Sequence, residues 1–442
     1  MKILLVCPKY EFQGYTPTGL ASIGAVAEKL GHQVTILDLN VERKPLKGYD
    51  LVGITGLSLW RKSIIETSRM FHNTPVIVGG AWATLQPKYA VSLPSIDFAC
   101  MREGEATFKE FLEKYPAVED VEGIVSTYKS NDHRPYIQDL DALPLPAWHL
   151  LNLTKYRRIS ITTSRGCPYR CIFCGVHQFL GRQWRYRSVE SVVEEIELLV
   201  RYKVERITFG DSNLTFIPDR FQAICEEIIN RKIKCEFDVI QGVRADRLTP
   251  QLLTTMKKAG FTEVIIAPES GSQRVVDDVV HKNLDLSTVE PVVKHCVEIG
   301  LNIGSFFVIG FPWETMEEIN ETIAFADKLR SMGSSCYVGN AIPILGTELY
   351  HRAKEEGFLR FDDPNLEELI YYSGLPREIH CLTSPYWKPE QIIALCKREQ
   401  EKNKGVEKQQ IRKTYFSYSI SKIAKKFVRH PIRTIRRALR VI

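Results

Sequence analysis

Short apolar runs alternate with amphipathic segments along most of this chain, and the alternation occurs in two separate blocks. The runs of the first block are nearly all apolar, as in parallel strands that helices cover on both faces. A helical segment over residues 20–30 is followed by Gly31, a common residue at helix C-termini. We therefore predict an α/β fold that opens with a doubly wound, Rossmann-like domain over residues 1–138. Its predicted strands are KILLVCP, QVTILDL, LVGITGLS, PVIVGGA and DFACMRE.

A proline-rich passage separates the two blocks. Pro144 and Pro146 disfavour regular structure, so residues 139–155 are predicted to form a linker. The second block, over 156–350, has six strand–helix units, which indicate a parallel, curved sheet or partial (β/α)6 barrel with its site at the carboxyl ends of the strands. Its predicted strands are ISITTSRG, RITFGDS, KCEFDVIQGVR, EVIIAPESGS, NIGSFFVIGFP and SCYVGNAIPI. An accessory region over 351–405 and a basic tail over 406–442 complete the chain.

Three features argue against whole classes of protein. The first residues, MKILLVCPKY, lack the apolar core and cleavage site of a signal peptide, and no apolar run reaches the roughly 20 residues that span a bilayer. The eleven cysteines, without a secretory signal, favour free thiols or metal ligands and a cytoplasmic location. The absence of a G-x-G-x-x-G fingerprint argues against a nicotinamide or flavin dinucleotide site.

Three cysteines lie close together directly after the first strand of the second block, in TTSRGCPYRCIFCG. Cys167, Cys171 and Cys174 have the spacing C-x3-C-x2-C. A structural zinc site needs a fourth ligand; His177 is near, but no second ligand pair follows. A ferredoxin-like carrier needs a fourth cysteine, and the next cysteines lie in another strand–helix unit. The thiols could also be buried core residues. The remaining interpretation is a metal group with one coordination position left open, as in catalytic sites.

This motif, with the aromatic Phe173 before its last cysteine, resembles the radical S-adenosylmethionine superfamily. The resemblance implies that the three thiolates hold a 4Fe-4S cluster and that S-adenosylmethionine chelates its fourth iron. An electron from the cluster would then break a carbon–sulfur bond of S-adenosylmethionine and give a 5'-deoxyadenosyl radical. Further contacts to this cofactor are implied at the ends of later strands. The candidates are Phe173, Gly210, Asp211, Ser212, Glu269, Ser270, Ile309 and Gly310.

Some of these residues have a second interpretation. Asp211 and Glu269 could instead be helix N-caps or first-turn acids. Arg185 and Arg187, in RQWRYRS, could pair with a carboxylate of the substrate or cofactor, or could form a solvated surface cluster. No catalytic residue is assigned.

The first domain resembles the cobalamin-binding domain of cobalamin-dependent radical S-adenosylmethionine enzymes. The similar segments are PTGLASIGAVAEKLGHQVTILDLN, PVIVGGAWATLQP and REGEATF, and the linker fits as well. The resemblance implies cobalamin contacts from Trp60, Gly79, Gly80, Trp82, Thr84, Glu103, Gly104 and Glu105.

Two departures from the family pattern matter. The D-x-H-x-x-G signature is absent, so we expect no histidine below the cobalt. Trp82 occupies a position where many relatives have histidine, and core packing is the alternative role for Trp82 and Trp60. The domain could also be a scaffold or a dimerisation module. The methylthiotransferase subclass is disfavoured, because only Cys7 and Cys100 precede the linker.

The basic tail has a pattern of its own. From Lys408 onward there are eleven Lys or Arg and no acidic residue, whereas residues 1–407 carry 48 basic and 53 acidic side chains. Apolar residues recur every three or four positions from Phe416 to Ile442, with an interruption at Pro431. Such a basic amphipathic helix is typical of a segment that lies on an anionic membrane surface, with nucleic acid as the rival partner.

Together these features predict a cobalamin-dependent radical S-adenosylmethionine enzyme that C-methylates an unactivated carbon. The substrate is expected to be a small molecule, lipid-like or a natural product, at the inner face of the membrane. A flavodoxin- or ferredoxin-like protein is expected to donate single electrons. Two alternatives stay open: a radical cyclase or rearrangement enzyme without net methyl transfer, and a non-catalytic cobalamin or redox sensor.

Overall fold

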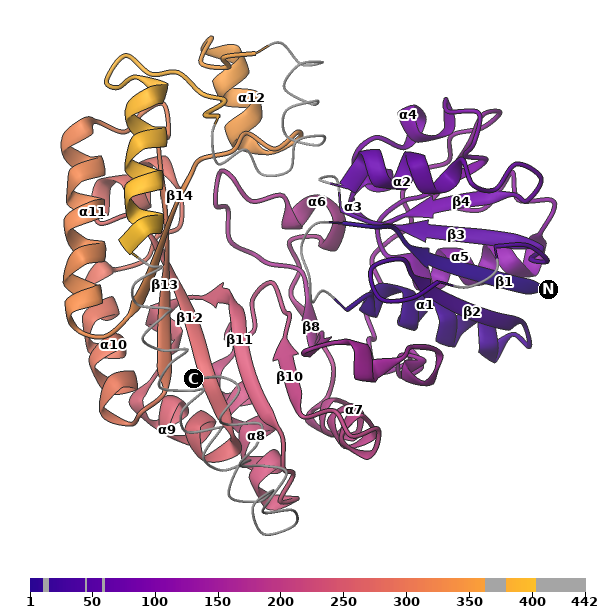
Figure 1. Ribbon diagram of the computed structural model, residues 1–442, viewed down its shortest axis with the longest axis horizontal. Helices are drawn as coiled ribbons and strands as arrows, with labels where there is room; N and C mark the ends of the chain where they lie inside the picture. Colours follow the sequence, from indigo (N-terminus) through magenta and orange to yellow (C-terminus); the bar gives the residue numbers. More distant parts are fainter. Residues whose placement is uncertain (11–15, 44–45, 58–59, 362–378, 403–442) are drawn as a thin grey trace, which may run out of the picture.

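The computed structural model describes residues 1–10, 16–43, 46–57, 60–361 and 379–402. Two six-stranded sheets lie side by side, each with its own helices, and the predicted α/β fold is confirmed (Figure 1). The basic tail over 406–442 lies outside the described residues. In the described ranges no helix is both long and apolar enough to cross a membrane.

The first sheet has the strand order β2-β1-β3-β4-β5-β6. Its first five strands are parallel, and β6, which was not predicted, pairs antiparallel with β5 at the edge. The strands are β1 Lys2–Cys7, β2 Gln33–Asp38, β3 Leu51–Thr55, β4 Val76–Gly79, β5 Phe98–Cys100 and β6 Ile124–Ser126. The helices are α1 Thr18–Lys29, α2 Arg61–Ser68, α3 Ala81–Leu85, α4 Pro87–Val91 and α5 Gly104–Lys114.

Alternate residues of β1 pack on opposite faces of this sheet. Ile3 and Leu5 face the side of α1 and α5, whereas Leu4 and Val6 face the side of α2, α3 and α4. All four side chains are buried, which explains why the strand is apolar from Ile3 to Val6.

The second sheet is entirely parallel, with the order β14-β13-β12-β11-β10-β7. The strands β7 and β14 are its two edges, so it is the predicted open barrel. Its strands are β7 Ile159–Ile161, β10 Arg206–Phe209, β11 Glu236–Val243, β12 Phe261–Glu269, β13 Asn302–Ile309 and β14 Ser335–Asn340. Its outer layer of helices is α7 Val189–Arg201, α8 Pro218–Asn230, α9 Pro250–Ala259, α10 Val289–Glu298 and α11 Met316–Ser331 (Figure 1).

Helix starts and stops in this layer follow local sequence signals. Thr315 and Glu318 form a capping box at the start of α11, and the Thr249 side chain caps α9, which ends at Gly260 in the left-handed conformation. Between β7 and α7 lie the hairpin strands β8 Ser164–Arg165 and β9 Arg185–Tyr186 and the short helix α6 Val176–Leu180. The chain continues after β14 with α12 Glu348–Glu355 and a helix over 389–402.

The linker is packed between the two domains. It contains two short 3-10 helices, η2 Trp148–Leu150 and η3 Leu153–Lys155. Trp148 is fully buried, and one continuous apolar cluster extends from the α1 side of the first sheet, past this tryptophan, to the core of the second sheet. The Ala147 N–H donates to the Ala21 carbonyl of α1 at 2.9 Å. The linker is therefore part of the core. The residues at which it begins and ends stay predictions.

Candidate active site

Two cavities meet at the carboxyl ends of the strands. The inter-domain cavity, of about 530 Å³, is lined by Gly53, Gly79, Gly80, Glu103 and Gly104 of the first domain and by residues of the linker and second domain. The cysteine cavity, of about 720 Å³, is lined by the three motif cysteines and by the ends of β10 to β14. Both cavities are lined by Val176, Gly210, Ser212 and Gln241, which we call the shared wall.

The cysteine loop, residues 166–175, joins β8 to α6 and is tied down along its length. The Cys167 N–H donates to the Gly181 carbonyl at 3.1 Å, and the Ile172 N–H donates to the Val280 carbonyl at 3.0 Å. Gly166 begins the loop with φ +85°, and a Cβ atom there would lie 2.1 Å from the Gln183 carbonyl oxygen. Only glycine fits this position, which explains the Arg-Gly before the first cysteine.

Burial raises the pKa of all three motif thiols, and that of Cys171 to about 12. The positive charge of Lys282 acts in the opposite direction on each of them, and Asn213 Nδ2 lies 3.6 Å from Cys167 Sγ. Such thiols keep their protons until a metal displaces them. Across the described ranges no group of His, Cys, Asp or Glu is arranged to hold a single metal ion, although the three cysteines face one cavity.

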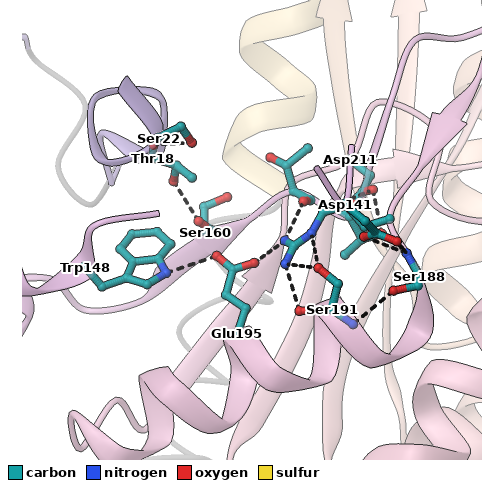
Figure 2. A network of polar contacts seen from close by, with 12 residues as sticks. Thr18, Ser22, Asp141, Trp148, Ser160, Ser188, Ser191, Glu195 and Asp211 are labelled. Atoms are coloured by element: carbon teal, nitrogen blue, oxygen red, sulfur yellow. Dashed lines mark hydrogen bonds and ion pairs between the residues drawn. The ribbon is translucent and has the colours of Figure 1, made fainter. Parts of the chain in front are cut away.

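Asp211 follows β10 and is buried beneath the segment that leads into the cysteine loop. Its carboxylate accepts hydrogen bonds from the Thr163 N–H at 3.0 Å, the Thr163 hydroxyl at 2.8 Å and the Ser164 hydroxyl at 2.6 Å (Figure 2). Burial raises its pKa despite these bonds. The helix-cap interpretation is wrong, because α8 begins only at Pro218. Gly210 and Ser212, on either side of Asp211, lie in the shared wall.

Glu269 ends β12 with φ 72° and lines the cysteine cavity together with Phe173. Its Oε1 atom accepts a hydrogen bond from Lys282 Nζ at 2.8 Å, and both side chains are more than nine-tenths buried. The neighbouring Ser270 shares a hydrogen bond with Thr322 of α11 at 2.8 Å, so its hydroxyl points away from the cavity toward the helix layer. Glu269 is therefore half of a buried ion pair and not a helix cap.

Ile309 and Gly310, which were predicted to contact S-adenosylmethionine, do not line the cysteine cavity. Phe306, Phe307 and Val308 of β13 line the cysteine cavity, whereas the Ile309 side chain is fully buried in the core. A Cβ atom on Gly310 would meet His380 and Ile392, each at 2.9 Å. A contact from Ile309 or Gly310 to S-adenosylmethionine stays a prediction, since neither residue lines the cysteine cavity.

The turn after β13 contains a buried carboxyl, Glu314. Its Oε2 accepts hydrogen bonds from the N–H groups of Gly310 at 2.7 Å and Phe311 at 3.0 Å, and Oε1 has no partner among the described residues. Burial raises the pKa of Glu314 to about 8. A pKa raised in the folded state favours folding at low pH, and this contribution is lost as the pH rises through about 8.

We expect Glu314→Gln to flatten the dependence of stability on pH. Between about pH 5 and 8 the parent protein should lose about 1 kcal/mol per pH unit more than the variant, because only the parent must release this proton on unfolding. Urea unfolding at a series of pH values measures this difference. The control is Glu317→Gln at the exposed neighbour, which should follow the parent. Parallel profiles for Glu314→Gln and the parent would contradict the assignment.

The first-domain candidates divide into two groups. Gly79, Gly80, Glu103, Gly104 and Glu105 line the inter-domain cavity. The other three candidates are Trp60, Trp82 and Thr84, and they line neither cavity.

These three side chains belong to the domain interior. Trp82 is fully buried and donates from Nε1 to Gln86 at 3.1 Å, so its role is core packing. Trp60 is also buried and stacks on Tyr10, with ring centroids 4.2 Å apart. The Thr84 hydroxyl donates to the Gly80 carbonyl at 2.9 Å and accepts from the Arg102 N–H at 2.8 Å.

Arg185 and Arg187 do not form the solvated surface cluster that was one of their two predicted roles, and a contact with a substrate or cofactor carboxylate stays a prediction. Both side chains are buried and paired within the protein, Arg185 with Glu103 and Arg187 with Glu195 of α7. Glu195 also accepts a hydrogen bond from Trp148 Nε1 at 3.0 Å (Figure 2). The two arginines therefore connect the second domain to the first domain and to the linker.

Sequence reasoning missed Lys282, Arg244 and Gln241. Lys282 and Arg244 both line the cysteine cavity, and Arg244 lies over the Tyr169 ring at 4.1 Å. Gln241 lies where the pairing of β11 with β12 shifts register, next to Gly242 with φ +80°. Such bulges turn side chains toward active sites, and a glycine inside a strand is the signal that could have revealed it.

Comparisons with known proteins agree with both domains. The family model described as the radical SAM superfamily matches residues 161–326, and the one described as the B12 binding domain matches residues 2–112. An uncharacterized methyltransferase of Pyrococcus horikoshii is 31% identical over 387 residues, which cover 80% of this chain and 83% of that protein.

Two further similarities cover most of the chain. Cytidylyl-2-hydroxyethylphosphonate methyltransferase of Streptomyces wedmorensis is 28% identical and covers 81% of each chain. In three dimensions the chain is similar to the radical S-adenosylmethionine methyltransferase TsrM of Kitasatospora setae. The TM-score is 0.68 at 19% identity, and the match covers 80% of this chain and 76% of TsrM. This last likeness concerns the fold.

Proposed function

Because this chain belongs to the cobalamin-dependent enzymes of the radical S-adenosylmethionine superfamily, we propose that it transfers a methyl group to an unactivated carbon of a small molecule. The cofactors of this family are a 4Fe-4S cluster, S-adenosylmethionine and cobalamin. The observation that carries the proposal is the shared wall. Because the two cavities have these residues in common, a substrate bound there can contact the contents of both cavities.

The residues of the cysteine cavity fit a cluster. Cys167, Cys171 and Cys174 would hold it, since all three thiols line one cavity and no other cysteine of the described ranges does. Phe173 and the Glu269–Lys282 pair would enclose S-adenosylmethionine beside it. Phe306, Val308 and Tyr337 line the same space and would help to exclude water from it once the cofactors are bound.

The inter-domain cavity fits a large planar ligand held by backbone. Gly79 at the end of β4 leaves room there, because a Cβ atom on it would touch nothing within 4 Å. Ligands of doubly wound sheets bind at this edge. When bound, the cluster supplies an electron for cleavage of S-adenosylmethionine, and cobalamin carries the methyl group. The absence of a histidine ligand below the cobalt stays a prediction.

Methyl transfer is the better supported of the two enzyme reactions. The Pyrococcus and Streptomyces relatives, each covering about four-fifths of the chain, are both named methyltransferases. The linker residues Leu140, Leu143 and Leu145 line the inter-domain cavity, as do Phe179 and Leu180, which supports a substrate with an apolar part if the substrate enters this cavity beside cobalamin.

A lipid-like substrate and a site at the inner membrane surface are proposals from the sequence of the tail alone. The full chain should bind vesicles that contain anionic lipid, and a chain that ends at residue 402 should not. Equal partitioning of the two chains, or binding to nucleic acid but not to vesicles, would contradict this part of the proposal.

The reaction can be tested without knowing the substrate. The full chain, reconstituted anaerobically with iron, sulfide and cobalamin, is supplied with a reductant, S-adenosylmethionine that carries a trideuterated methyl group, and a small-molecule extract of a deletion strain. We expect 5'-deoxyadenosine, S-adenosylhomocysteine and a product that carries the labelled methyl group. 5'-Deoxyadenosine without the other two products indicates a cyclase or rearrangement enzyme. If neither 5'-deoxyadenosine nor S-adenosylhomocysteine forms, the result indicates a sensor.

A further inference from the structure

Four buried charged side chains connect the first domain to the cysteine loop. Glu103 and Glu105 come from the start of α5, and Arg165 and Arg185 come from the β8–β9 hairpin on either side of the cysteine loop. We call these four residues the bridging cluster. Sequence reasoning assigned the two glutamates to cobalamin, but their carboxylates are occupied by the two arginines.

The arginines and glutamates of the bridging cluster form ion pairs with defined hydrogen bonds. Arg185 Nη1 donates to both carboxylate oxygens of Glu103 at 2.8 Å, and Arg165 donates to both oxygens of Glu105, at 2.6 and 3.3 Å. Arg165 also reaches Glu103 at 3.3 Å. The Ile137 N–H, just before the linker, donates to Glu103 at 2.7 Å. All four side chains are at least four-fifths buried.

The cluster holds the segments on both sides of the cysteine loop, β8 before it and the end of α6 after it. Arg165 precedes Cys167 by two residues, and Arg185 Nη2 donates to the carbonyl of Leu180, the last residue of α6, at 2.7 Å. A buried ion pair adds little net stability compared with apolar residues of the same size, but in some proteins it fixes one relative orientation. The geometry therefore points to a role in orientation.

We propose that the bridging cluster positions the cysteine loop against the first domain, with Arg165 and Glu105 as the central positioning residues. The positioning role itself is independent of the proposed function, but its effect on methyl transfer rests on that function. The orientation that it fixes would set how the contents of the two cavities face each other across the shared wall.

A double-mutant comparison separates positioning from stability. The variants are Arg165→Met, Glu105→Leu and the pair together, with Arg231→Met as the control in a partly exposed ion-pair network between α7 and α8. Each full-length chain is examined by thermal unfolding and by hydrogen exchange of peptides from residues 163–186. In the single variants we expect a lower Tm and exchange about tenfold faster than in the parent.

The double variant decides the question. Its Tm should return toward that of the parent, because no charge is left unpaired at this contact, but its loop should still exchange about tenfold faster. Recovery of loop protection together with Tm would overturn the proposal, as would parent-like exchange in the single variants. If the single variants do not fold, Arg165→Lys is used instead, because it keeps the charge but not both hydrogen bonds to Glu105. Hydrogen exchange of the loop equal to that of the parent in Arg165→Lys would also overturn the proposal.

A second readout addresses catalysis. In the reconstituted double variant, with iron and cobalamin content equal to the parent, the yield of methylated product per 5'-deoxyadenosine should fall about tenfold. If the parent itself transfers no methyl group, the proposed function fails while the exchange result still stands for or against positioning. An unchanged yield with a loosened loop would overturn the catalytic meaning of the inference.

Discussion

Replacing Cys171 with alanine is expected to abolish cluster assembly and, with it, reductive cleavage of S-adenosylmethionine. The cysteine cavity has three thiols from the chain, so the variant would retain only two protein ligands. Iron and sulfide content, visible absorption and 5'-deoxyadenosine formation after anaerobic reconstitution measure the effect. We expect loss to the background of the assay, because no other cysteine of the described ranges lines this cavity.

The matched control for this variant is Cys235→Ala. Cys235 is a partly exposed thiol directly before β11, outside the two cavities. Its replacement should leave iron content and cleavage unchanged. Iron content equal to the parent in Cys171→Ala would show that the cluster assignment is wrong, and reduced iron in both variants would indicate non-specific loss.

Replacing Lys282 with methionine is expected to destabilise the protein by about 3–5 kcal/mol, since it leaves the Glu269 carboxylate buried and unpaired. The expected effect is large because Glu269 Oε1 and Lys282 Nζ lie 2.8 Å apart with both side chains more than nine-tenths buried. Urea unfolding measures it. Binding of S-adenosylmethionine should also weaken, because Glu269 and Lys282 line the cysteine cavity beside Phe173.

The pair allows an internal comparison. The double variant Glu269→Gln/Lys282→Met removes both charges and should be more stable than Lys282→Met alone. Lys328→Met breaks the exposed pair of Lys328 with Glu290 and should cost less than about 1 kcal/mol. If Lys282→Met is as stable as Lys328→Met, the Glu269–Lys282 pair is not the buried contact described above.

Periodicity and motif spacing predicted the two sheets and the cysteine loop, because these are local signals. The apolar runs marked the strands, and Cys167, Cys171 and Cys174 marked the loop between β8 and α6. The contacts of polar residues were harder to predict. The partner of Arg185 is Glu103, which lies 82 positions earlier, and no local pattern links them.

Strand orientation set a second limit. Alternation of polar and apolar residues shows which face of a strand is buried, but parallel strands covered on both faces lack that alternation. Ile309 and Val308 are both apolar, so the sequence alone could not tell which one faces the cysteine cavity. Trp82 posed the same problem, because a large aromatic residue near a cavity is equally compatible with the core.

The buried Trp148 has a consequence for how this protein comes apart. Its ring belongs to an apolar cluster that includes residues of both sheets, and its Nε1 is bonded to Glu195 of α7. Disruption of either sheet therefore exposes apolar surface that the other sheet shares, which couples the loss of one domain to the loss of the other. Different family models match the two domains, yet we expect them to unfold as a single cooperative unit.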